Sequence, residues 1–116
     1  MILNVRKIDK FENNICLTYT TTEPTCIVDI QYIPGEYVID ECYDFMTLKD
    51  AGSMHELLLY GAENILEDLV DKLHPQYISV RVIANRITKK NEVYVNRGVT
   101  DDFKDVAVFK LAEYLR

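Results

Sequence analysis

His55 and Glu56 are the residues of this 116-residue chain whose types and position best suit the binding of a small polar ligand. They fall in the first turn of a helix predicted over residues 53–73, where backbone N–H groups have no partner within the helix. Helix starts of this kind hold small polar ligands. A second interpretation is structural, because Ser53 and Glu56 form the S-x-x-E pattern of a capping box, in which the glutamate only closes the helix end.

The helix itself is predicted from an apolar stripe with steps of three and four residues. The stripe consists of Met54, Leu58, Ala62, Ile65, Leu66, Leu69 and Leu73. This spacing is typical of a helix that lies across a sheet. Pro75 ends the helix, because its ring and its missing N–H cannot continue the hydrogen-bond ladder.

Three cysteines, Cys16, Cys26 and Cys42, are the candidates for thiol chemistry. Their odd number and the absence of a C-x-x-C pair argue against a disulfide framework and against a zinc site. Each is expected to be a small buried hydrophobic residue. Cys16 is also a candidate nucleophile, because it precedes the threonine-rich residues 18–22.

The composition limits the classes of function. A chain of this length is expected to form one domain over residues 1–116. Its formal net charge of −6 gives it no electrostatic reason to bind a phosphate backbone, so a small molecule is the preferred partner class over nucleic acid. It has no apolar run long enough to span a membrane and no signal-peptide pattern at its start. A cytoplasmic protein is therefore expected.

Period-two patterns predict strands on both sides of the long helix. The expected strands cover residues 2–8, 15–22, 26–33, 78–84 and 92–95. A short helix is expected to begin near Asp40 or Glu41, and a C-terminal helix is expected from Asp101 onward, because acidic residues favour a helix start. The predicted fold class is α+β with an antiparallel sheet.

Five stretches of the chain resemble, in the same order, the 7-cyano-7-deazaguanine reductases of queuosine biosynthesis. The stretches are Glu23-Pro24 with Ile30-Gln31-Tyr32-Ile33-Pro34, Asp40-Glu41, Gly52-Ser53-Met54-His55-Glu56, Leu73-His74-Pro75-Gln76-Tyr77-Ile78 and Asn96-Arg97-Gly98. The resemblance implies the tunnelling fold (T-fold), in which ββααββ units assemble side by side into barrels with ligand sites between the subunits. It therefore implies a homo-oligomer.

The resemblance also implies which residues hold a purine-like base. Glu56 matches the family's glutamate that binds the guanine-like edge of the base, where one carboxylate accepts two N–H groups from the ring. His55 matches an active-site histidine. Asp40 and Glu41, near the family's Glu-Ser, are further candidates for substrate binding.

The chain departs from the family at the residues that carry the reaction. Thr18 stands where the family has the cysteine that attacks the nitrile carbon, and Cys16 lies two residues earlier. Thr25 stands where the family has its proton-donating aspartate. The segment Cys42-Tyr43-Asp44-Phe45 lacks the positive charge of the family's NADPH-binding run. The cofactor is therefore unknown, with NADPH expected if the protein is a reductase.

Three functions are open on these grounds. The first is an enzyme that acts on the nitrile of 7-cyano-7-deazaguanine by reduction or by amidine transfer, with Cys16 and His55 as catalytic candidates. The second is a T-fold protein that binds the base through Glu56, or only forms an oligomer, and has no catalytic cysteine. The third is a pterin enzyme of the same fold, which is the weakest because His55 and His74 are too few histidines for a zinc site.

Overall fold

The computed structural model describes residues 1–9, 15–22, 26–43, 54–85 and 90–114, and the side chains of the long helix from residue 61 onward. The elements are β1 (Ile2–Lys7), β2 (Leu17–Thr22), β3 (Cys26–Ile33), β4 (Tyr37–Tyr43), α1 (Met54–Leu73), β5 (Tyr77–Asn85), β6 (Lys90–Gly98), the 3-10 turn η2 (Asp101–Phe103) and α2 (Lys104–Tyr114). The order confirms an α+β chain with a C-terminal helix.

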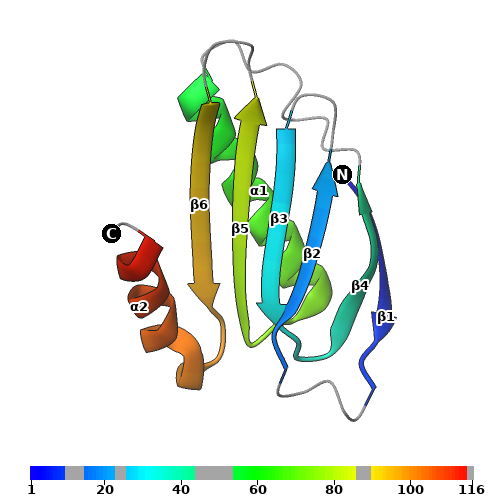
Figure 1. The fold of residues 1–116 in the computed structure, drawn as a ribbon. Coiled ribbons are helices and arrows are strands. Elements are labelled where there is room, and N and C mark those ends of the chain that lie inside the picture. Colours follow the sequence, from blue (N-terminus) through cyan, green and yellow to red (C-terminus); the bar gives the residue numbers. More distant parts are fainter. Residues whose placement is uncertain (10–14, 23–25, 44–53, 86–89, 115–116) are drawn as a thin grey trace.

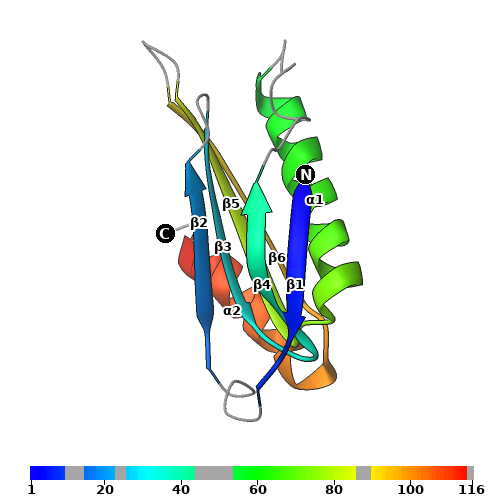
Figure 2. The same cartoon turned by 90° about the vertical axis from the view of Figure 1, so that its right-hand side faces the viewer.

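One four-stranded antiparallel sheet, in the order β2-β3-β5-β6, organises the molecule, and β1 and β4 form a separate antiparallel pair. Figures 1 and 2 show that α1 and the β1–β4 pair lie on one face of this sheet. The second helix, α2, lies on the other face, beside β6. Within the described ranges, no helix is both long and apolar enough to cross a membrane.

The core forms between the sheet and α1, as the two periodic patterns predict. In β3 every second residue, from Cys26 to Tyr32, is buried. The described part of α1 buries Ala62, Ile65, Leu66, Leu69 and Leu73. These helix positions belong to the predicted stripe, while Glu63 and Glu67 between them are exposed. The predicted cap at Ser53 lies outside the described residues.

The helix ends where Pro75 predicts. The N–H of His74 donates to the carbonyl of Val70 at 3.1 Å, and His74 has a positive φ of 47°. This left-handed residue turns the chain out of the helix, as at many helix C-termini. The chain then enters β5. Just before this strand, the N–H of Gln76 donates to the carbonyl of Ile33 at 2.8 Å and so connects the chain to the end of β3.

The prediction of a short helix from Asp40 or Glu41 is wrong, because both residues belong to strand β4. The pairing of Asn4 with Glu41 and of Val5 with Ile39 leaves Asp40 as an extra residue in β4, which is a β-bulge. Because of the bulge, Asp40 and Glu41 are both exposed although they are consecutive. The sequence therefore lacks the alternation that predicts a strand. Any helix within residues 44–53 lies outside the described residues.

Two tyrosines hold the β1–β4 pair against the sheet. The hydroxyl of Tyr32 accepts the N–H of Ile39 at 2.8 Å, and the hydroxyl of Tyr19 accepts the N–H of Cys42 at 3.0 Å. The tyrosine rings therefore cross the core and satisfy backbone groups of β4 that lie over the sheet.

Candidate functional site

The first turn of α1 carries His55 and Glu56, the residues expected to hold a base. The backbone of both residues is helical, and their side chains lie outside the described part of the helix. Asp40 and Glu41 are exposed on β4, which runs toward the end of the molecule at which α1 begins (Figure 2). Glu41 accepts a hydrogen bond from the Asn4 amide at 3.3 Å. Asp40 is the middle residue of β4, and the N–H of the preceding Ile39 donates to the hydroxyl of Tyr32 near the end of β3. The structure therefore does not place these acidic residues beside the first turn of α1.

Cys16 lies at the other end. It is exposed, so the expectation that every cysteine is buried is wrong for this residue. Cys16 directly precedes β2, whose first residue, Leu17, pairs with Tyr32 near the end of β3. The end of β3 is bonded to Gln76, just after the C-terminus of α1. Since α1 has 20 residues, its first turn lies roughly 30 Å from that end. Figure 1 shows β2 starting at the lower end of the sheet and α1 at the upper end. The structure does not bring Cys16 together with the first turn of α1.

The other two cysteines behave as predicted. Cys26 is 4% exposed and Cys42 is not exposed at all, and both belong to the hydrophobic core. A buried thiol in apolar surroundings is a poor source of thiolate. No group of three or more His, Cys, Asp or Glu side chains that could hold a metal ion occurs among the described residues.

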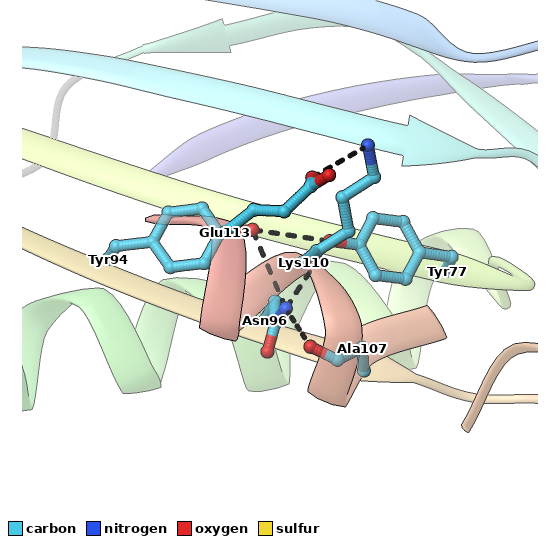
Figure 3. Close-up of polar contacts among 6 residues, drawn as sticks. All are labelled: Tyr77, Tyr94, Asn96, Ala107, Lys110 and Glu113. Atoms are coloured by element: carbon cyan, nitrogen blue, oxygen red, sulfur yellow. Dashed lines mark hydrogen bonds and ion pairs between the residues drawn. The ribbon is translucent and has the colours of Figure 1, made fainter. Parts of the chain in front are cut away.

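The structure reveals a polar network that sequence reasoning missed, on the sheet face beneath α2 (Figure 3). The hydroxyls of Tyr77 and Tyr94 lie 3.2 Å apart. The amide of Asn96 donates to the Ala107 carbonyl at 2.7 Å and lies 3.4 Å from the Tyr77 hydroxyl. Burial, and then the hydrogen bond with Tyr94, raise the pKa of Tyr77 well above its usual range. Tyr77 is connected to α2 through Asn96, which bonds the Ala107 carbonyl.

Three ion-pair contacts lie next to this network. On the sheet, Arg81 contacts Asp29 at 3.3 Å and Glu92 at 3.5 Å. On α2, Lys110 contacts Glu113 at 3.6 Å. Between them is a hollow of about 310 Å³, called the α2 hollow below. Its lining residues are Asp29, Gln31, Ser79, Arg81, Tyr94, Lys110, Glu113 and Tyr114.

A larger hollow, of about 500 Å³, lies between α1, β6 and Leu111 of α2. Arg97 of β6 forms an ion pair there with Glu67 of α1. The hydrogen bond from Arg97 lowers the pKa of Glu67, and the same bond raises the pKa of Arg97. These two charges are paired with each other, as are those of the α2 hollow.

The α2 hollow was not predicted from the sequence, because its lining residues come from four elements that are distant along the chain: β3, β5, β6 and α2. A partial signal was available: Asp29 and Arg81 are polar residues of the two clearest strands, and they are direct partners in the β3–β5 register. Only the register, which the sequence alone does not supply, makes them neighbours.

Comparison of this chain with protein-family models finds no match, and comparison with curated protein sequences finds none either. The likeness to the 7-cyano-7-deazaguanine reductases therefore stays a resemblance of five short stretches. Its implications for fold and function are treated below as proposals.

Proposed function

We propose that this chain is a T-fold-like binding protein that holds a purine-like base, such as 7-cyano-7-deazaguanine, through Glu56 without attacking its nitrile. The observation that supports this choice is the distance between Cys16 and the first turn of α1, at opposite ends of the fold. Covalent attack requires the thiol within a few ångströms of the bound base. Cys26 and Cys42 are buried in the core and offer no substitute.

The arrangement of the sheet supports the T-fold part of the proposal. The four antiparallel strands of the sheet lie side by side in the order in which they occur along the chain. In the sequence α1 comes between β3 and β5, and in space it lies on one face of the sheet. The chain also differs from a ββααββ unit. Strand β4 follows β3 and pairs with β1, so the described residues form six strands.

Side-by-side assembly does not change the position of Cys16 relative to the base. In a ring whose axis runs along the strands, the rotation that relates the subunits leaves the strand direction of every subunit unchanged relative to the axis. The Cys16 end of a neighbour then lies level with the Cys16 end of the first subunit. A base at the first turn of α1 is therefore as far from the Cys16 thiol of a neighbour as from that of its own subunit. This arrangement favours binding over catalysis.

Calorimetry with 7-cyano-7-deazaguanine tests the binding function. The wild-type chain should bind the base, and Glu56→Gln should weaken binding by about 1.5–3 kcal/mol, the scale of a hydrogen bond to a charged group. Glu63→Gln, which removes an exposed charge farther along α1, should bind as the wild type does. Binding that is equal in Glu56→Gln and wild type would leave Glu56 with only a capping role.

Intact-mass analysis distinguishes this proposal from the enzyme, for which the exposure of Cys16 is the supporting observation. After incubation with the nitrile, the mass of the protein should be unchanged. An adduct of one substrate mass that disappears in Cys16→Ala would establish the enzyme instead.

We also propose that the protein is a homo-oligomer. The outer edges of β2 and β6 are the two edges of the four-stranded sheet, and α2 lies beside only the lower half of β6 in Figure 1. The rest of β6 and all of β2 can pair with a neighbour, and unpaired edges favour such pairing. Sedimentation equilibrium at micromolar concentration should give a mass of at least two chains. A mass of 13.5 kDa, that of one chain, would contradict assembly and the sites between subunits.

A further inference from the structure

We propose that the α2 hollow is a second binding site, for a small zwitterion of the α-amino acid type with an aromatic side chain. The cationic side chains of the hollow would hold the carboxylate of the ligand, and its acidic side chains would hold the ammonium group. This site lies on the sheet face opposite α1, so it is separate from the proposed base site and does not depend on it.

The charges of the hollow favour a zwitterion. Two ion pairs from different elements line it, Arg81 with Asp29 on the sheet and Lys110 with Glu113 on α2. Among the lining residues two cations and two anions balance, and Glu92, which also contacts Arg81 at 3.5 Å, is not one of them. A ligand that carries both signs can pair with all four groups. The side chains of Arg81, Lys110 and Glu113 are 42%, 52% and 47% exposed, so a ligand can reach them from solvent.

The guanidinium of Arg81 is the cation on the sheet side of the hollow. Its Nε is shielded from solvent, so a carboxylate that enters the hollow would meet the two outer nitrogens, which contact Asp29 and Glu92. A guanidinium binds carboxylates through such N–H groups. Ser79, which is 3% exposed, also lines the hollow and adds a hydroxyl.

The aromatic part of the ligand is inferred from Tyr94 and Tyr114. Their rings are stacked with centroids 4.4 Å apart and planes at 17°, and both line the hollow. Burial, and then a hydrogen bond with Glu92, raise the pKa of Tyr114, so its ring stays neutral near pH 7. A third ring can pack against this pair. The volume of about 310 Å³ suits only a small ligand.

Titration of the full chain with L-phenylalanine, followed by NMR, tests the proposal. The backbone amides of Arg81, Lys110 and Tyr114 should shift. Two related probes each lack one charge: 3-phenylpropionate has no ammonium group, and phenethylamine has no carboxylate. Each should bind about tenfold more weakly, the effect of losing one charge-assisted hydrogen bond. Equal affinity for all three probes, or shifts confined to other regions, would overturn the assignment.

A pair of variants on α2 locates the carboxylate contact. Lys110→Gln should weaken L-phenylalanine binding by about tenfold. Lys104→Gln removes the same charge from the same helix but outside the hollow, where Lys104 pairs with Asp101 at 2.8 Å; it should bind as the wild type does. Equal loss in both variants would mean that only the general charge of α2 matters, and it would refute the site. Glu56→Gln should bind normally, so failure here is distinct from failure of the proposed base site.

Discussion

Replacing Gly35 by alanine should lower the free energy of unfolding by about 3 kcal/mol, the upper part of the range for overpacking. A Cβ at this position would overlap the carbonyl oxygen of His74, at the point where the chain leaves α1. Neither side can move away easily. The Gln76 N–H donates to the Ile33 carbonyl at 2.8 Å, and the Gln76 side chain donates to the Pro34 carbonyl at 2.9 Å. The two backbone segments are therefore held together where the methyl group would have to fit.

Urea denaturation followed by circular dichroism measures this loss. Glu36→Ala is the matched control, because Glu36 is the exposed neighbour of Gly35 in the same turn. Its stability should stay within about 0.5 kcal/mol of the wild type, as is usual for surface substitutions. If Gly35→Ala unfolds at the same urea concentration as Glu36→Ala, the turn can accommodate the methyl group. The close approach of Gly35 to the His74 carbonyl would then not constrain the fold.

The parts of the fold that the sequence predicts well are those with one periodic apolar pattern and a clear stop. Strand β3 has its predicted bounds, because its alternating residues face a core on one side only. The end of α1 is also predicted, because Pro75 cannot continue a helix. In both cases the signal depends on the local chain and needs no partner.

The parts that were not predicted depend on a partner. Strand β4 is irregular because it pairs with β1 through a bulge at Asp40, so its polar residues do not alternate. Strand β6 extends to Gly98, beyond the predicted 92–95, because its pairing with β5 continues to Tyr77. Pairing between distant strands thus extends elements that local patterns leave short.

The candidate sites show the same division. His55 and Glu56 were selected for their place at a helix start, and α1 does begin there. That Cys16 lies at the opposite end follows from the order of the strands and the length of α1, which local spacing does not give. The α2 hollow needs both the β3–β5 register and the docking of α2, so no single stretch of sequence contains it.

Replacing Gly98 by alanine should detach η2 and α2 from the sheet while the rest of the fold persists. A Cβ on Gly98 would overlap the carbonyl of Phe103 and lie 2.7 Å from the backbone nitrogen of Lys104. Unlike the clash at Gly35, this one can be relieved cheaply, because no residue of η2 or α2 is buried. The helix is held mainly by the Asn96 bond to Ala107 and by the Tyr94–Tyr114 stack.

Native-state hydrogen exchange separates the two regions. In Gly98→Ala the amides of α2 should lose their protection, while those of β3 and β5 should keep theirs, since elements with few buried contacts open independently of the core. Thr100→Ala is the control, because the Thr100 side chain makes no capping hydrogen bond; its exchange should match the wild type. Loss of protection in β5 together with α2 would show instead that α2 is part of the cooperative core. Because α2 supplies one side of the α2 hollow, Gly98→Ala should also abolish the amide shifts caused by L-phenylalanine.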